Sequence, residues 1–256
     1  MKLAITGKGG VGKTTLAALL AHAFAERGQK VLAIDADPAM GLAAACGVPP
    51  EQVATITPIA DMEELIYERT GARKGEIGGI FRLNPRVDDI PDRFSLSRDG
   101  IRILTMGTVK IAGSGCLCAE NALLRSLVTY LLLRHDEVLI MDMEAGVEHL
   151  GRGTASAVDA LIVVVEPGRR STQTAQSIRS LGQEIGVGRI YGVANKVTSE
   201  ADRAFIIGQL PDLPMLGFLP ADPLAIEADQ SGQAVFDVAP QLITEARAII
   251  DRLESV

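Results

Sequence analysis

The sequence predicts an α/β fold, in which a mainly parallel sheet is flanked by helices on both faces. Short apolar runs recur along the chain and end in turn residues, as at 3–5 and 31–34. Stretches with helical spacing lie between these runs, and strands that alternate with helices build parallel sheets. Hydrophobic residues make up 47% of the 256 residues, which is enough for a sizeable core.

The expected elements follow from these runs in chain order. Strands are expected at 3–5, 31–34, 101–104, 138–141, 160–165, 189–193 and 215–218. Helices are expected from about 13 to 24 and at 119–134, 171–186, 200–210 and 239–254. Residues 70–99 are rich in Arg, Gly, Asp and Pro, and we expect them to form a long surface excursion over the sheet. No repeat or low-complexity segment interrupts the pattern, so 1–256 is expected to form a single domain.

Composition argues against several kinds of partner. The net charge is −7, the pI is near 5.1, and no Lys/Arg block is present, so the chain is not expected to bind nucleic acid. Trp is absent and aromatic residues are 4%, which disfavours stacking on bases. The first apolar run ends within a few residues, and no run reaches transmembrane length. We therefore expect a cytoplasmic protein with no membrane partner.

A glycine loop, G-K-G-G-V-G-K-T-T, runs from Gly7 to Thr15 between a strand pattern and a helix pattern. It fits G-x-x-x-x-G-K-[ST], in which backbone N–H groups and the N-terminus of the following helix cradle phosphates. Lys13 is expected to neutralise the β- and γ-phosphates, and the Thr14 hydroxyl to ligate Mg²⁺. The expected nucleotide contacts are Gly9, Gly10, Val11, Gly12, Lys13, Thr14 and Thr15.

Lys8 is a second lysine inside this loop. It could be a solvated side chain, or it could reach a nucleotide bound by a second copy of the chain, as an arginine finger does. The spelling K-G-G-V-G-K-T resembles the deviant Walker A family, which includes MinD, ParA and the nitrogenase iron protein. This resemblance implies a P-loop fold of the nitrogenase iron protein/MinD type. It also implies ATP or ADP and Mg²⁺ as cofactors, and a homodimer in which Lys8 acts across the interface.

Carboxylates follow two of the predicted strands. Asp35 and Asp37 end the second strand, where ligands bind in such sheets, although they could also be a solvated pair. By resemblance to the family's switch I, Asp37 orients the attacking water and Asp35 lies in the Mg²⁺ shell. Asp142 ends a hydrophobic strand, which is the Walker B arrangement that holds Mg²⁺. Gly146 resembles the switch II glycine, whose N–H senses the γ-phosphate.

A base pocket is expected further along the chain. Asn195, followed by Lys196, comes at the end of a strand, and its carboxamide offers a donor and an acceptor that match adenine N6 and N7. In the family this asparagine reads the base. Pro220 and Asp222, after the last strand, are expected to form another wall of the pocket, with a simple turn as the alternative.

Cys116 and Cys118 lie in the segment 113–120, G-S-G-C-L-C-A-E. They are poor disulfide partners, and the helix that follows favours thiolates, which bind soft metals. Because a closed site usually needs four ligands, a two-fold dimer would supply the four sulfurs. The alternative is two buried small hydrophobic residues. Cys46, in an Ala-rich helix, is expected in the core.

Three longer motifs narrow the resemblance: G-x-C-x-C-x-E-N, I-D-A-D-P and M-D-M-E-A-G-V-E-H-L-G-R-G-T. Together they resemble the nickel-insertion ATPases, of the CooC type that serves carbon monoxide dehydrogenase and the AcsF type that serves acetyl-CoA synthase. The resemblance implies ATP hydrolysis coupled to metal delivery, and a homodimer bridged by Ni²⁺ or Zn²⁺ at Cys116 and Cys118. The sequence is compatible with either client enzyme, and we expect residues 70–99 to determine which of the two is recognised.

Two other functions compete with this one. An electron-transfer ATPase with an intersubunit 4Fe–4S cluster is the first, but that class carries its two cluster cysteines far apart in sequence. A positioning ATPase of the MinD/ParA kind is the second. The final helix, 239–254, has a mixed-sign exterior rather than the Lys/Arg-rich face of a membrane-surface helix, which argues against it.

Overall fold

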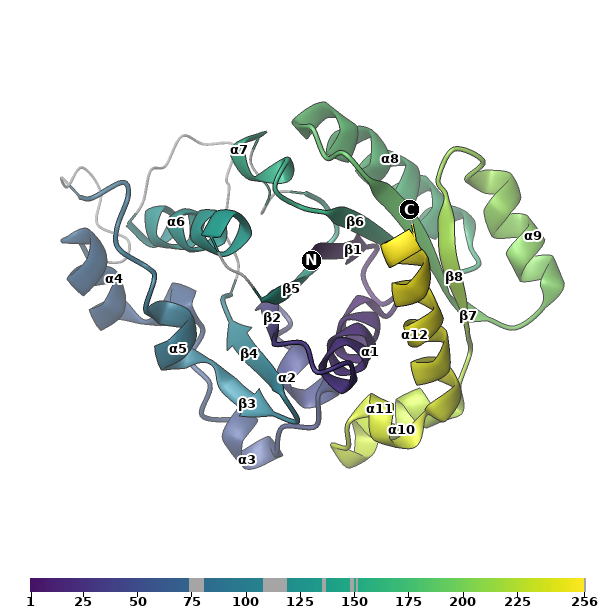
Figure 1. The fold of residues 1–256 in the computed structure, drawn as a ribbon, viewed down its shortest axis with the longest axis horizontal. Helices are drawn as coiled ribbons and strands as arrows, with labels where there is room; N and C mark the ends of the chain where they lie inside the picture. The colour runs from purple at the N-terminus through teal and green to yellow at the C-terminus, as the bar shows by residue number, and fades with distance from the viewer. Residues whose placement is uncertain (74–80, 108–118, 135–136, 148–149, 151, 256) are drawn as a thin grey trace.

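The computed structural model describes the chain except for residues 74–80, 108–118, 135–136, 148–149, 151 and 256. Its centre is an eight-stranded sheet with the order β3-β4-β2-β5-β1-β6-β7-β8 (Figure 1). The strands are β1 Lys2–Gly7, β2 Val31–Ala36, β3 Leu96–Arg98, β4 Ile101–Thr105, β5 Val138–Met143, β6 Ala160–Val165, β7 Ile190–Val197 and β8 Met215–Pro220. All neighbouring pairs are parallel except β3 with β4. The predicted α/β class is confirmed.

Helices lie between the strands and cover both faces of the sheet. They are α1 Lys13–Glu26, α2 Leu42–Ala45, α3 Pro50–Val53, η1 Ile59–Asp61, α4 Glu63–Thr70, α5 Ile90–Phe94, α6 Ala119–Arg134, α7 Arg152–Ala155, α8 Arg169–Ile185, α9 Glu200–Gln209, α10 Pro223–Ser231, α11 Val235–Val238 and α12 Pro240–Ser255. The five predicted helices are α1, α6, α8, α9 and α12. None of the helices in the described ranges is long and apolar enough to cross a membrane.

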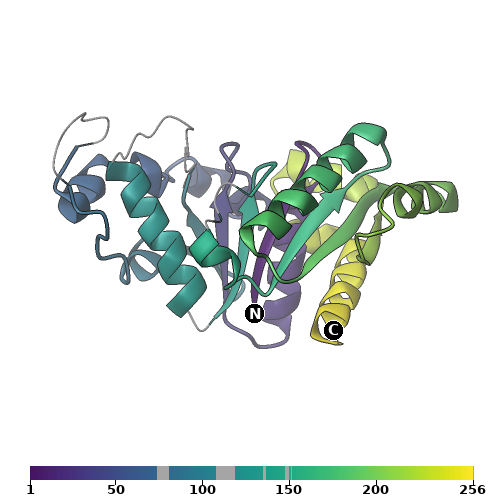
Figure 2. The same ribbon diagram turned by 90° about the horizontal axis from the view of Figure 1, so that it is seen from above.

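Two hydrophobic cores form because successive side chains of a strand point to opposite faces. Leu3 and Ile5 of β1 pack with α1, α11 and α12, whereas Ala4 packs with α6, α8 and α9. Figure 2 views the molecule from the side that α6, α7 and α8 cover, with α1 behind the sheet. Since both faces are covered, the central strands are buried along nearly their whole length, which explains their continuous apolar runs.

The final helix, α12, docks against α1 and β8. Its apolar face is buried, and its exposed face forms ion pairs with the end of α1 and its C-cap, from Arg247 to Glu26 at 2.8 Å and from Glu254 to Arg27 at 2.9 Å. The predicted docking helix is confirmed. Its buried residues include Leu242, Ala246, Ile249, Ile250 and Leu253.

The described part of the 70–99 segment contains elements that the sequence pattern did not predict. α5 and the edge strand β3 lie within it, and Val87 and Ile90 are buried in the core beside α6. Arg69 of α4, just before the segment, donates a 2.7 Å hydrogen bond to Asp89 within it, which ties this part of the segment to α4. Val87 and Ile90 therefore anchor the segment to the core, while most of its other described residues are exposed or half-buried.

Candidate functional site

The glycine loop joins β1 to α1 at the carboxyl edge of the sheet, as predicted from the strand–loop–helix pattern. Gly12 caps α1 with a φ of 94°, a left-handed conformation that favours glycine. A Cβ atom on Gly12 would lie 2.2 Å from Asn195 Nδ2, so no larger residue fits without displacing Asn195. The loop is therefore shaped by its own glycines and by a side chain from β7.

Parallel register brings the predicted carboxylates together beside the loop. Asp35 on β2 is the sheet partner of Asp142 on β5. The Thr14 hydroxyl donates a 2.7 Å hydrogen bond to Asp142 Oδ2. Lys13 Nζ lies 3.4 Å from Asp37 Oδ2. The five residues expected around phosphate and metal thus share one corner of the molecule.

Burial changes the acidity of two of these carboxylates. It raises the pKa of Asp142 to about 7, opposed by the hydrogen bond from Thr14. It raises the pKa of Asp35 to about 6, although the backbone N–H groups of Leu42 and Asp37 donate to that carboxylate. A bound cation would favour the charged form of both groups.

The donor set suits Mg²⁺ together with a nucleotide. Asp142 Oδ1 is buried and has no hydrogen-bond partner within the described residues, so one oxygen is available to a cation or its water. No group of three or more His, Cys, Asp or Glu in the described ranges could hold a metal ion by itself. Mg²⁺ usually binds proteins through one or two carboxylates and completes its coordination with substrate phosphates. Asp142 and Asp35 provide carboxylates and Thr14 a hydroxyl, so phosphate oxygens could fill the remaining positions.

Gly146 is held in place by Thr6, a residue that the sequence analysis missed. The Gly146 N–H donates to Thr6 Oγ1 at 3.1 Å, and the Thr6 hydroxyl lies 2.9 Å from the Gly146 carbonyl oxygen. Thr6 is fully buried on β1. In the sequence, the only feature that marks Thr6 is its position immediately before the glycine loop. Its hydrogen bonds to Gly146 depend on how the chain folds.

The predicted base-pocket residues border one cavity of about 630 Å³. Asp222 also caps α10, because its Oδ1 accepts a 3.0 Å hydrogen bond from the Leu224 N–H. The sequence analysis missed the wall that α10 and α11 provide. The cavity is lined by the predicted Gly10, Gly12, Thr14, Thr15, Asn195, Lys196, Pro220 and Asp222, and also by Ile226, Gln233 and Val235.

Asn195 and Lys196 both contact the backbone of the glycine loop. Asn195 Nδ2 donates to the Val11 carbonyl at 2.8 Å, and Lys196 Nζ donates to the Gly10 carbonyl at 2.6 Å. The Asn195 Oδ1 accepts from the Lys196 N–H at 2.9 Å. In this structure the carboxamide therefore supports the loop, a role that the sequence analysis did not predict.

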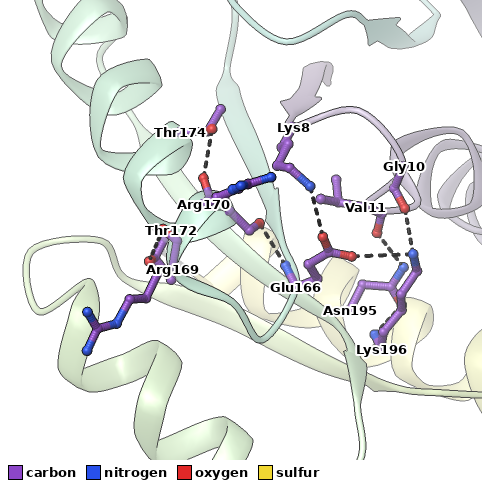
Figure 3. A network of polar contacts seen from close by, with 11 residues as sticks. Lys8, Gly10, Val11, Glu166, Arg169, Arg170, Thr172, Thr174, Asn195 and Lys196 are labelled. Carbon is purple, nitrogen blue, oxygen red and sulfur yellow. Dashed lines mark hydrogen bonds and ion pairs between the residues drawn. The ribbon is translucent and has the colours of Figure 1, made fainter.

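Lys8 forms an ion pair within its own chain. Its Nζ lies 3.2 Å from Glu166 Oε1, and Lys196 Nζ lies 3.4 Å from Glu166 Oε2 (Figure 3). Lys8 does not line the cavity of about 630 Å³ described above, which we call the nucleotide cavity. The sequence analysis did not single out Glu166, because it belongs to no phosphate-binding motif, although it too follows a buried strand.

Cys116 and Cys118, which are expected to bind metal, lie outside the described residues. Cys46 is fully buried in the core, as predicted, and burial raises the pKa of its thiol to about 12. A thiol this difficult to ionise is a poor metal ligand.

The glycine loop, the paired carboxylates and the flanking helices define a P-loop nucleotide-binding protein. The model of the CobQ/CobB/MinD/ParA nucleotide binding domain matches residues 2–235. The chain belongs to this family and is a P-loop ATPase of the CooC/MinD kind.

Its relatives point to one branch of the family. The chain is 47% identical over 253 residues to the carbon monoxide dehydrogenase accessory protein CooC of Rhodospirillum rubrum, covering 99% of this chain and 96% of that protein. It is 42% identical to an uncharacterized ATP-binding protein of Methanocaldococcus jannaschii, covering 92% and 91%.

Solved structures share the fold at low sequence identity. The MinC:MinD cell division complex of Aquifex aeolicus matches with a TM-score of 0.70 and 19% identity, covering 100% of this chain and 96% of that one. MinD of Pyrococcus horikoshii, complexed with Mg-ADP, matches with a TM-score of 0.66 and 19% identity, covering 99% and 96%.

Proposed function

We propose that this chain is a cytoplasmic nickel metallochaperone, which hydrolyses ATP and helps to insert nickel into carbon monoxide dehydrogenase. The observation that carries the proposal is the 47% identity, over nearly the full length of both chains, to a protein named as an accessory of that enzyme. The same identity favours carbon monoxide dehydrogenase over acetyl-CoA synthase as the client.

Hydrolysis is assigned to the corner that holds Lys13, Asp37 and Asp142. Lys13 would bind the terminal phosphates, while Thr14, Asp142 and Asp35 would hold Mg²⁺, which would supply positive charge to the transferred phosphoryl group. Asp37 pairs with Lys13 at 3.4 Å. A triphosphate that attracts Lys13 would release this carboxylate, which then orients the attacking water.

Metal binding is assigned to Cys116 and Cys118 from two chains, which together supply four thiolates. The helix α6 begins at Ala119, directly after this segment, and packs against α7, which follows Gly146 in the chain. The N–H of Gly146 is the proposed sensor of the γ-phosphate. This packing supports a route by which nucleotide state reaches the cysteines.

The test is the activation of nickel-free carbon monoxide dehydrogenase under anaerobic conditions, with Ni²⁺, ATP and this chain. Wild type is expected to speed nickel incorporation, whereas the Cys116→Ser/Cys118→Ser double variant and Asp37→Asn should not. Cys46→Ala and Asp212→Asn are the matched controls, since Cys46 lies in the core and Asp212 is exposed away from the loop. The proposal fails if the double variant incorporates nickel as fast as wild type.

A further inference from the structure

One carboxylate links the two lysines that flank the tip of the glycine loop. Glu166 directly follows β6 and faces the loop at the carboxyl edge of the sheet (Figure 3). Its two oxygens pair with different lysines, Lys8 at 3.2 Å and Lys196 at 3.4 Å. The Glu166 N–H donates to Ser171 Oγ at 3.0 Å, which fixes its backbone against the first turn of α8.

The nucleotide cavity does not explain this arrangement. Neither Lys8 nor Glu166 borders the cavity, and both side chains are partly open to solvent, at 36% and 26%. A lysine held by Glu166 cannot at the same time reach a nucleotide on another chain. The ion pair therefore affects when Lys8 is free to contact a second chain, rather than how one chain binds its own nucleotide.

The surroundings of the pair carry an excess of positive charge. Arg169 and Arg170 are exposed in the first turn of α8, where acidic residues would suit the helix dipole better. Figure 3 shows the Arg170 side chain reaching toward Lys8, beside Glu166, whereas the Arg169 side chain points away from this pair. Such a surface attracts an anionic partner, such as the face of a second copy that carries a bound triphosphate.

We propose that Glu166 is a positioning residue, which holds Lys8 on its own chain until the nucleotide of a second copy draws the lysine across the interface. This inference rests on the proposed ATPase function and on the trans role of Lys8 that the resemblance to the deviant Walker A family implies. A triphosphate offers more charge and more acceptor oxygens than one carboxylate, so it wins the exchange once the chains meet. Lys196 keeps its bond to the Gly10 carbonyl, so the loop stays supported after Lys8 leaves.

Glu166→Gln tests the exchange, because it keeps the shape of the side chain and removes its charge. With a non-hydrolysable ATP analogue and Mg²⁺, the dissociation constant of the dimer should fall roughly two- to five-fold, the range expected for losing a partly exposed ion pair. Analytical ultracentrifugation measures this constant. The Cys116→Ser/Cys118→Ser background removes dimerisation driven by metal.

Glu200→Gln is the matched control, since its side chain is 86% exposed and pairs only with Arg203 among the described residues. It should leave the constant unchanged. Glu166→Asp keeps the charge but is one methylene shorter, so it should recover part of the wild-type behaviour.

A second readout reports on Lys8 without dimerisation. In the nucleotide-free chain labelled with ¹⁵N-lysine, a held ammonium group gives a resolved NMR signal, assigned by its loss in Lys8→Arg. Glu166→Gln should abolish this signal. If Glu166→Gln changes neither the signal nor the dimer constant, the inference is wrong.

The two proposals fail separately. Suppose that Lys8→Ala dimerises with the ATP analogue as wild type does, while Glu166→Gln still loses the Lys8 signal. Lys8 would then have no role at the nucleotide of a second copy. The hold of Glu166 on Lys8 would then stand, and its exchange with a second copy would be refuted.

Discussion

Asp142 and Asp35 are buried carboxyl groups whose pKa values, about 7 and about 6, lie above the ordinary value near 4. The folded chain therefore keeps protons that the unfolded chain has already released between roughly pH 4 and pH 7. The stability that these protons contribute is fully present below pH 4. In the absence of a bound cation, this stability is lost as the pH rises through about 6 and 7, because Asp35 and Asp142 then become charged while buried.

Asp142→Asn should remove much of this pH dependence, because the amide keeps the shape of the carboxylate without titrating. Without nucleotide and Mg²⁺, wild type should lose about 2–3 kcal/mol relative to the variant between pH 5 and pH 8. Urea unfolding at each pH measures the difference, and Asp212→Asn serves as the exposed control. Parallel pH profiles for wild type and Asp142→Asn would contradict the pKa assigned to Asp142.

Lys13 is a nearly buried lysine, with 7% of its side chain exposed and a carboxylate 3.4 Å away. Lys13→Ala should weaken ATP binding on the order of 10²-fold or more, because a desolvated charge-assisted contact to the phosphates is lost. Isothermal titration with ATP and Mg²⁺ measures it. Lys30→Ala, an exposed lysine away from the loop, should bind as wild type does. Unchanged affinity in Lys13→Ala would remove this lysine from the site.

At the scale of elements, the loop between β1 and α1 depends on β7. Asn195 supports the Val11 carbonyl and lies where a Cβ on Gly12 would be. Asn195→Ala should leave the fold intact but leave that buried carbonyl unsatisfied, which costs about 1–2 kcal/mol and weakens ATP binding roughly 5- to 30-fold. Titration against the exposed control Gln29→Ala checks this. ATP binding by Asn195→Ala at wild-type strength would show that the loop keeps its shape alone.

Most elements could be predicted from the sequence because their signals are local. The glycine loop, the strand ends at Asp35 and Asp142, and the docking face of α12 follow from spacing and hydrophobicity over a few residues. The strand β3 could not be predicted, since three residues carry too little pattern and its antiparallel pairing with β4 depends on the fold.

The contacts that shape the site span long distances in the chain. Thr6 meets Gly146 across 140 residues, and Lys8 meets Glu166 across 158. The strand order decides such meetings, and one residue of each pair, Thr6 or Glu166, belongs to no motif. The positions of the glycine loop and of the carboxylates beside it were therefore predictable, whereas the contacts that Thr6 and Glu166 make with the loop and with residue 146 were not.

At the scale of the whole molecule, the account needs two chains. If Lys8 acts on the partner's nucleotide, Lys8→Ala and Asp37→Asn should each be slow alone, with rates lower by about 10²- to 10⁴-fold for Asp37→Asn. Mixing the two variants should restore activity, because a mixed dimer keeps one composite site with both residues intact. ATPase assays on tagged and isolated heterodimers measure this. No recovery in confirmed heterodimers would place Lys8 outside the partner's site.

The paired cysteines are the other reason for two chains. Cys116 and Cys118 supply two thiolates from each chain, so four sulfurs require a dimer. If the nucleotide site and the metal site are coupled, ATP changes the metal affinity and metal changes the ATP affinity by the same factor. The Cys116→Ser and Cys118→Ser variants should still bind ATP, because the phosphate loop lies elsewhere in the chain.

The most direct test is the ratio of metal to chains, measured by native mass spectrometry during an anaerobic Ni²⁺ titration. The account predicts one nickel per two chains, a dimer that forms as the metal is added, and its reversal by chelator. Either serine variant should stay monomeric under the same conditions. One nickel per monomer, or metal-driven dimers of either serine variant, would contradict the account, and iron in place of nickel after anaerobic purification would favour an electron-transfer ATPase.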